Sequence, residues 1–288
     1  MAACVRIRTL AKVNLYLEVL GRRADGYHDV VSVMQSVTLA DDLEIEERPS
    51  GIEVVCDAPG VPTDESNLVA RAWRRFRLHA GGPDGLRVRI GKRIPVAAGL
   101  GGGSANAAGV LAGLSAMRGG RPDLARLAAE VGSDVPFFLE GGTRLAGGRG
   151  TDLEPLPALP PCWIVLACPD VRVETRWAYG RLKLPLTRDR EFLTMILAGL
   201  RQGDARAVAG GLFNRFERVV FGAYPELDDL KGEMLRRDAL GVVLSGSGPT
   251  LLAVSESQET ASALSAWLSK QGVRSFVTEP ARKGLELL

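Results

Sequence analysis

The sequence predicts an α+β fold divided into two domains. A chain of 288 residues is long for one domain and short for three. Its opening third alternates strand-like runs with turn residues, and the rest mixes helical and strand-like segments in an order typical of an α+β sandwich with helices on one face. The prolines of PLPALPP stop both helix and central strand. We therefore expect one domain over residues 1–157 and a second over 158–288.

The composition is that of an ordinary soluble globular protein, with 46% hydrophobic and 24% charged residues. The 36 basic and 34 acidic residues are interspersed and leave a net charge of +2, which argues against a nucleic-acid partner. No leader-like segment and no uninterrupted apolar run of about 18 residues occurs, so we expect a cytoplasmic protein with no membrane partner. The scattered cysteines and two histidines fit no standard zinc site, and we expect buried free thiols at Cys4, Cys56, Cys162 and Cys168.

The opening third consists of predicted strands and one helix. Strict alternation of apolar residues predicts a strand over 5–19, with Lys12, Asn14 and Tyr16 on its more polar face. The turn GRRADGYH follows, and then come the strand-like runs VVSVMQSVTLA, DDLEIEE and GIEVVCD. Helical spacing over 67–80 gives way to GLRVRIGKRIPVA, which returns to strand.

Helices are predicted over about 105–117, over 123–131 and from residue 135 onward. After the proline-rich stretch, CWIVLACP is typical of a buried strand, and GVVLSGSGPTLLAV is typical of a strand, a glycine turn and a strand. A helix over 257–272 and a last strand, VRSFVTEP, complete the chain.

The stretch PVAAGLGGGSANAA (95–108) puts four glycines into five positions just before a helix. Glycines there expose backbone N–H groups, and the helix dipole favours negative charge, so the loop suits a phosphate group; a structural turn is the alternative. The loop fits neither a Walker A motif, which needs GK followed by Ser or Thr, nor the dinucleotide GxGxxG, which meets Ser104 at its third glycine. It is therefore a phosphate-loop candidate of a third kind.

Three polar positions have two interpretations each when judged locally. Ser104 follows the glycines, where its hydroxyl can cap the helix or reach a phosphate or Mg²⁺. Asp134, in GSDVPFF, precedes a Val-Pro pair and suits either a helix N-cap or a catalytic base. Lys12 is either a solvent-exposed strand residue or a functional cation, in a chain that otherwise prefers arginine.

The turn ADGYH presents an aromatic ring and an imidazole together. Tyr27 and His28 suit a ring-shaped ligand by stacking and hydrogen bonding, and the alternative is a partly buried turn aromatic beside a chance histidine. A second small-residue turn, SGSGPT, lies between two strands and lacks the GxSxG pattern of a hydrolase nucleophile.

Three segments together resemble the motifs of the GHMP small-molecule kinases: AKVNLYLEVLGRRADGYH, PVAAGLGGGSANAA and LSGSGPT, in that order and at about that spacing. The resemblance runs from about residue 10 to residue 254. It implies an N-terminal domain of ribosomal protein S5 domain 2-like fold that holds ATP, and a C-terminal ferredoxin-like α/β sandwich on the substrate side. Within the family, ADGYH, GLGGGS and GSDVPFF are similar to the members that act on 4-diphosphocytidyl-2-C-methyl-D-erythritol.

The resemblance also implies a reaction and its participants. ATP with Mg²⁺ would phosphorylate the 2-hydroxyl of that cytidine compound, in non-mevalonate isoprenoid synthesis, with Asp134 as the base and Lys12 as the cation that orients it and steadies the transferring charge. These roles fit phosphoryl transfer, which depends on positioning and charge stabilisation. The implied ATP-binding residues are Pro95, Val96, Ala97, Ala98, Gly99, Leu100, Gly101, Gly102, Gly103, Ser104 and Ala105. The implied substrate-binding residues are Asn14, Tyr27, His28, Thr175 and Tyr179, and the third motif is the loop of Ser245, Gly246, Ser247 and Gly248.

One departure concerns the hydroxyl chemistry of the loop. Many members carry a second serine where this chain has Ala105, so Ser104 is the candidate for contact with phosphate or metal. Two alternatives to this function remain at this point: a GHMP kinase of the mevalonate or homoserine type, against which ADGYH argues, and a catalytically silent sensor of the same fold, against which the presence of Lys12 and Asp134 argues.

Overall fold

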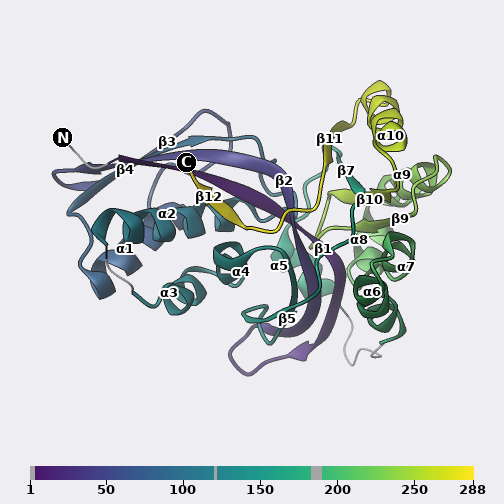
Figure 1. Ribbon diagram of the computed structural model, residues 1–288, viewed down its shortest axis with the longest axis horizontal. Coiled ribbons are helices and arrows are strands. Elements are labelled where there is room, and N and C mark those ends of the chain that lie inside the picture. The colour runs from purple at the N-terminus through teal and green to yellow at the C-terminus, as the bar shows by residue number, and fades with distance from the viewer. Residues whose placement is uncertain (1–3, 120–121, 183–189) are drawn as a thin grey trace.

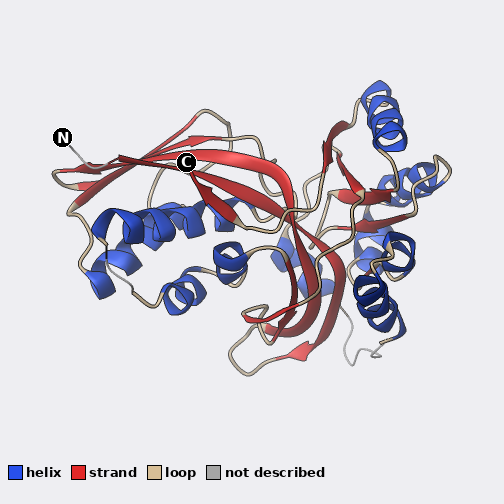
Figure 2. Ribbon diagram, viewed as in Figure 1, coloured by secondary structure: helices blue, strands red, loops and turns tan. Residues whose placement is uncertain are grey.

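A computed structural model describes residues 4–119, 122–182 and 190–288 of the chain. Its strands form two sheets, each with its own helices (Figures 1 and 2). The first sheet has the order β12-β1-β2-β4-β3, with β5 beside β2, β6 beside β5, and β8 beside β1. Its strands are β1 (Cys4–Arg22), β2 (His28–Arg48), β3 (Gly51–Cys56), β4 (Gly85–Gly91), β5 (Thr143–Gly147), β6 (Asp152–Pro155), β8 (Phe213–Asn214) and β12 (Leu285–Leu287).

Two long antiparallel strands, β1 and β2, form the centre of this sheet (Figure 1). β2 is continuous, so the runs predicted over 30–40 and 41–47 belong to one strand. The β1–β2 register shifts at Leu10/Ala11 and again at Asn14/Tyr16. Such bulges bend a strand and re-aim its side chains. The segment between them carries Lys12 and Asn14.

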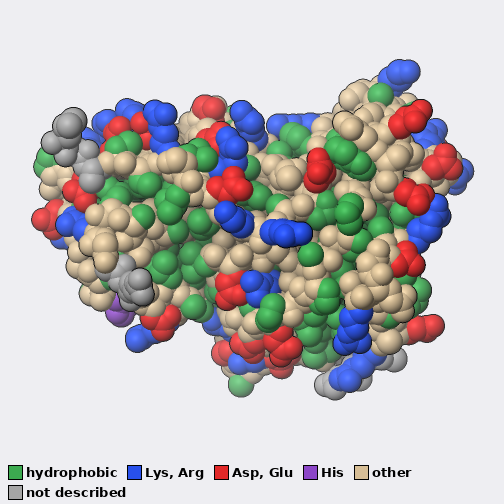
Figure 3. All heavy atoms as spheres, in the orientation of Figure 1, with side chains coloured by type: hydrophobic (Ala, Val, Ile, Leu, Met, Phe, Trp, Pro, Cys, Tyr) green, Lys and Arg blue, Asp and Glu red, His purple; other side chains and the backbone are tan. Residues whose placement is uncertain are grey.

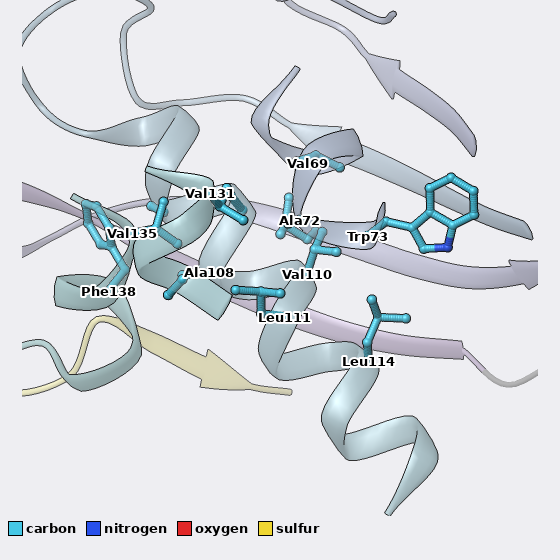
Figure 4. Close-up of a cluster of buried hydrophobic side chains, with 14 of the residues drawn as sticks. Val69, Ala72, Trp73, Ala108, Val110, Leu111, Leu114, Val131, Val135 and Phe138 are labelled. Atoms are coloured by element: carbon cyan, nitrogen blue, oxygen red, sulfur yellow. The ribbon is translucent and has the colours of Figure 1, made fainter. Parts of the chain in front are cut away.

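Helices α1 (Leu68–Ala80), α2 (Gly102–Arg118), α3 (Leu124–Val131) and α4 (Val135–Glu140) cover one face of the first sheet. The side chains of these four helices meet in a buried hydrophobic cluster (Figure 4). Asn67 starts α1 by accepting a hydrogen bond from the Val69 N–H, as an N-cap does. The helix expected from about residue 105 begins earlier, at Gly102, so two glycines of the loop are already helical.

The second sheet is antiparallel with the order β11-β7-β10-β9, formed by β7 (Trp163–Cys168), β9 (Gly241–Leu244), β10 (Leu251–Ser255) and β11 (Arg274–Thr278). The remaining helices are α5 (Thr175–Arg181), α6 (Glu191–Gln202), α7 (Ala205–Gly210), α8 (Glu217–Ala223), α9 (Pro225–Leu235) and α10 (Gln258–Lys270). Because strand side chains alternate, Leu166 and Leu252 pack with α6, α7 and the first sheet, whereas Val165 and Ala253 pack with α8, α9 and α10. The expectation of helices on one face is therefore wrong for this sheet.

The chain returns to the first sheet at its last strand. β12 pairs with β1, with Leu287 opposite Ile7. This strand comes after VRSFVTEP, which the sequence predicted to be the last strand. Three residues are too few to show a period in the sequence, which is why β12 was not predicted. The domain boundary at 157/158 stays a prediction.

The expectation of buried thiols is correct for one cysteine. Cys162 is buried, and burial raises its thiol pKa to about 11. Cys4 is exposed because it begins β1 at the outer end of the sheet, and Cys56 and Cys168 are half-buried.

The surface carries charges of both signs. On the face shown in Figure 3, lysine and arginine side chains alternate with aspartate and glutamate. Among the helices that the structure describes, none has the length and apolar character needed to cross a membrane.

Candidate active site

A cavity of about 1390 Å³ is lined by segments that belong to both sheets or pack beside them. These segments are β1, the glycine loop, the start of α4, α5 and the loop between β9 and β10. Typical small-molecule sites are about 300–1,000 Å³, so this one has room for two ligands side by side. Every predicted catalytic and substrate-binding residue lines it: Lys12, Asn14, Tyr27, His28, Asp134, Thr175 and Tyr179.

The glycine loop lies directly against β1 and the β9–β10 loop. The Lys12 N–H donates to the Leu100 carbonyl at 3.0 Å. A Cβ on Gly99, whose φ is +76°, would lie 2.2 Å from the Ser245 carbonyl oxygen, and one on Gly101 would meet the Phe138 ring at 2.6 Å. Larger residues cannot fit this close approach, so the glycines are required by packing and backbone conformation.

The loop ends as an uncapped helix N-terminus. Gly101 is the N-cap of α2, has φ +72°, and supplies no side chain to satisfy the first N–H groups of the helix. Ser104 lies in the first turn, half-buried and lining the cavity, so its interpretation as the helix cap is wrong. Free N–H groups and the helix dipole make this end a site for an anion.

Two residues of the predicted phosphate loop do not reach the cavity. Leu100 and Ala105 are buried in hydrophobic clusters, and neither lines the cavity. The position where many family members carry a second serine is thus occupied here by Ala105, whose side chain faces the core. The neighbouring Ser104 does line the cavity with its hydroxyl group.

Lys12 and Asp134 meet on the cavity wall. The Lys12 Nζ lies 3.5 Å from the Asp134 Oδ2, and the side chains are 5% and 35% exposed. Lys12 is thus not solvent-exposed, because the face of β1 that alternation marked as polar is covered by the glycine loop. Asp134 occupies the N-cap position of α4, but its side chain makes no capping hydrogen bond. Its carboxylate is instead beside a buried ammonium and open to the cavity.

A chain of hydrogen bonds fixes the Lys12 ammonium. Lys12 Nζ donates to Asn14 Oδ1 at 2.7 Å, Asn14 Nδ2 donates to Ser32 Oγ at 2.8 Å, and Ser32 Oγ donates to the Tyr16 carbonyl at 2.6 Å. All of these side chains are buried. Asn14 therefore orients Lys12, in addition to lining the cavity.

Aromatic rings line the far end of the cavity. The His28 and Tyr179 ring centroids are 4.7 Å apart, and Phe216 packs edge-on against Tyr179. Burial, followed by the charge of Arg22, lowers the pKa of His28 below 6.5, which leaves it neutral at pH 7 with one donor and one acceptor nitrogen. Burial, followed by the charge of Asp134, raises the pKa of Tyr179 to about 12. Tyr27 is 51% exposed.

The β9–β10 loop contacts both the glycine loop and the part of the cavity wall that carries the aromatic rings. Ser245 Oγ donates to the Gly99 carbonyl at 3.1 Å, and the Ser247 and Thr175 hydroxyl oxygens are 2.9 Å apart. Gly246 and Ser247 line the cavity, whereas Ser245 and Gly248 do not. This second small-residue turn therefore supports the loop and also contributes part of the wall.

Sequence reasoning missed several lining residues. Lys92 lines the cavity near Gly102 and is paired with the buried Asp41, 51 residues away in sequence. Arg149, a segment before α1 (residues 61–62 and 66–67) and Leu68, the first residue of α1, also line it. A signal existed for Lys92, since lysine is rare in this chain, but no sequence pattern marks its partner.

The chain matches two family descriptions, "GHMP kinases N terminal domain" over residues 67–142 and "GHMP kinases C terminal" over residues 196–274. The chain belongs to the GHMP kinase family. It is therefore an ATP-dependent small-molecule kinase, and its predicted α+β fold of two GHMP kinase domains is confirmed.

Curated relatives of this GHMP kinase cover nearly its whole length. It is 40% identical over 290 residues to 4-diphosphocytidyl-2-C-methyl-D-erythritol kinase of Gloeobacter violaceus, covering 98% of this chain and 96% of that one. It is 42% identical over 302 residues to the protein of the same name from a Synechococcus strain, covering 100% and 97%.

Solved structures agree in fold. A crystal structure of 4-(cytidine 5'-diphospho)-2C-methyl-D-erythritol kinase superposes with a TM-score of 0.82 at 35% identity, covering 96% of this GHMP kinase and 99% of that chain. Homoserine kinase from Cytophaga hutchinsonii gives a TM-score of 0.78 at 21% identity, covering 99% and 97%, and shares the fold alone.

Proposed function

We propose that this GHMP kinase transfers the γ-phosphoryl group of ATP to the 2-hydroxyl of 4-diphosphocytidyl-2-C-methyl-D-erythritol, in the synthesis of isoprenoid precursors. The observation that carries the proposal is the Lys12–Asp134 pair, 3.5 Å apart between a glycine loop and a group of aromatic rings in one cavity. A phosphoryl donor and a nucleotide-linked alcohol can then meet at the carboxylate. Full-length similarity to kinases named for that substrate supports the choice of acceptor.

The glycine loop and the start of α2 would hold the triphosphate. Their uncapped N–H groups and positive dipole suit phosphate oxygens, and Gly103 leaves open space, since a Cβ there would meet only Leu68 at 3.8 Å. The Ser104 hydroxyl and the Asp134 carboxylate line the same cavity and are hard oxygen donors, which fits Mg²⁺ bound mainly through phosphates and water. When bound, Mg²⁺ would neutralise charge on the β- and γ-phosphates.

Asp134 would act as the base. As the acceptor hydroxyl oxygen forms its bond to the γ-phosphorus, its proton passes to the Asp134 carboxylate and the bond to ADP breaks. The Lys12 ammonium, held by Asn14, would steady negative charge on the phosphoryl group as it moves.

The cytidine would bind among the rings at the far end. Neutral His28 offers one donor and one acceptor to the edge of a base, and Tyr27 offers an exposed face for stacking. Thr175, hydrogen-bonded to Ser247, would complete this end. A mevalonate or a homoserine has no ring for these groups to contact.

The deciding experiment supplies purified protein with ATP, Mg²⁺ and one acceptor at a time, and detects the phosphorylated product by mass spectrometry and phosphorus NMR. We expect product with 4-diphosphocytidyl-2-C-methyl-D-erythritol and none with mevalonate or homoserine. Product from either of these, with the cytidine substrate untouched, would refute the proposal. Binding of the cytidine substrate without turnover would instead indicate a silent sensor.

A further inference from the structure

The turn between β5 and β6 (residues 148–151) reads GRGT, and its Arg149 side chain reaches Tyr27 of the ADGYH turn. Its own hydrogen bond runs from Gly150 N to the Gly147 carbonyl at 2.9 Å, and Val30 of β2 donates to the Gly148 carbonyl at 2.8 Å. Gly148 and Gly150 both have positive φ, as a turn this tight requires. The hydrogen bond between Val30 and Gly148 thus holds the residue next to Arg149 against β2, two residues after His28.

The Arg149 guanidinium contacts both the Tyr27 ring and the end of α3. Its Cζ lies 4.8 Å from the centroid of the Tyr27 ring, and its Nη2 donates to the Ala129 carbonyl at 3.3 Å. Ala129 belongs to the last turn of α3, where carbonyls lack helical partners and a cation is favourable. The guanidinium is therefore anchored by a helix end on one side and lies against an aromatic ring on the other.

Tyr27 differs from the other aromatic residues of the cavity in how it is held. Tyr179 is packed between His28 and Phe216, with ring centroids 4.7 Å away on each side. Tyr27 is half exposed, and its backbone N–H is fixed by the Asp25 carboxylate at 3.1 Å. Its ring is supported by the cation of Arg149.

We propose that Arg149 is a positioning residue for substrate recognition: it holds the Tyr27 ring in place so that its free face stacks on the pyrimidine of a cytidine nucleotide. The inference rests on the proposed function and adds a residue that determines affinity for the cytidine moiety. A ring immobilised before binding loses less conformational freedom when the base stacks on it, so affinity rises. Because Arg149 lies at the substrate end of the cavity, its replacement should leave the affinity for ATP unchanged.

The first test compares KM for each substrate in Arg149→Met and Arg149→Lys. Loss of the cation–π contact should raise KM for the cytidine substrate by about 3- to 30-fold in Arg149→Met, with less effect in Arg149→Lys, which keeps a cation. KM for ATP and kcat should change less than about twofold. Arg77→Met is the matched control, because Arg77 lies over the Trp73 ring outside the cavity, and it should leave both KM values unchanged.

The second test asks whether Arg149 acts through Tyr27. In a double-mutant cycle with Tyr27→Leu, Arg149→Met should have no further effect on KM or on the affinity for cytidine diphosphate measured by calorimetry. The proposal is overturned if Arg149→Met leaves KM for the cytidine substrate unchanged, if it raises both KM values together with a lower melting temperature, or if its effect is undiminished in Tyr27→Leu. An inactive wild-type protein would refute the proposed function instead, so the two failures are distinguishable.

Discussion

Two lysines that line the cavity, Lys12 and Lys92, are each paired with a carboxylate, and the two pairs differ in what surrounds that carboxylate. Asp41 is fully buried and accepts hydrogen bonds from Lys92 Nζ, from the Arg93 and Ile94 N–H groups, each at 2.8 Å, and from Asn106 Nδ2 at 2.9 Å. Asp134 is 35% exposed beside Lys12 and opens to the cavity. Both lysine side chains are almost equally buried. A saturated carboxylate serves the fold, whereas an open one can accept a proton.

The largest effect is expected for Asp134→Asn. An amide cannot take the proton of the acceptor hydroxyl, so kcat should fall by about 10²- to 10⁴-fold. Because the Asp134 side chain is 35% exposed and Lys12 Nζ keeps its hydrogen bond to Asn14 Oδ1, the free energy of unfolding should change by about 1 kcal/mol or less. Steady-state kinetics with an ATP-binding titration checks this: ATP affinity should stay near that of the wild type, and unchanged kcat would remove Asp134 from the role of base.

The same substitution in the other pair, Asp41→Asn, should act on stability. It leaves the Lys92 ammonium buried without a counter-charge and also removes the charge of a fully buried carboxylate that accepts from the Arg93 and Ile94 N–H groups, which together costs about 3–5 kcal/mol of unfolding free energy. Urea unfolding measures the loss, with Asp134→Asn as the matched control. The double variant Asp41→Asn with Lys92→Met should recover much of it, since no buried charge remains. Equal stability of the two single variants would contradict the distinction between the pairs.

Neighbouring glycines at the start of α2 sharpen the comparison further. A Cβ on Gly102 would lie 2.7 Å from Lys92 Nζ and 3.0 Å from Ile94, whereas one on Gly103 meets only Leu68 at 3.8 Å. Gly102→Ala should therefore destabilise the protein by about 1–3 kcal/mol. Gly103→Ala should be neutral or slightly stabilising in thermal unfolding, yet weaken ATP binding because its methyl group enters the phosphate site. Normal ATP affinity in Gly103→Ala would argue against phosphates at this helix end.

The smallest effect concerns His28, a titratable group at the substrate end that carries no charge at pH 7. Its pKa is lowered by burial and by Arg22, so the unfolded chain takes up the proton first as the pH falls through about 6.5. The stability that neutral His28 contributes is thus present above that pH and is lost as the pH falls through the folded-state pKa. Proton NMR of the two histidines, assigned with His79→Gln, should give His28 a midpoint below 6.5; a midpoint at or above this value contradicts its burial.

Much of the fold followed from local patterns. Helical spacing predicted α1, and the glycine turn between apolar runs predicted the β9–β10 hairpin. The bulges on each side of Lys12 were not predictable, because they depend on how β2 pairs with β1 and not on either strand alone. The Lys92–Asp41 pair was missed for a similar reason: it forms between segments far apart in sequence.

The candidate site depended on the resemblance more than on local residues. Judged alone, Lys12 was better explained by solvent exposure and Asp134 was better explained by capping, because neither neighbourhood indicates that the glycine loop covers β1 or that α4 begins beside it. Three motifs taken together supplied that long-range information. Arg149 lies outside all three motifs, and its relation to Tyr27 emerged only from the folded chain.

The pairing of β12 with β1 has a consequence for synthesis. Ile7 pairs with Leu287, and the Leu10 N–H donates to the Gly284 carbonyl, so residues from opposite ends of the chain meet at one sheet edge. A ribosome releases β1 early and its edge partner late. Until then, the strand that carries Lys12 has an uncovered edge, which is the kind of surface from which chains associate wrongly. Helices α1–α4, which cover the first sheet, can assemble during translation. The edge of the sheet at β1 is closed only once residues 284–288 have emerged.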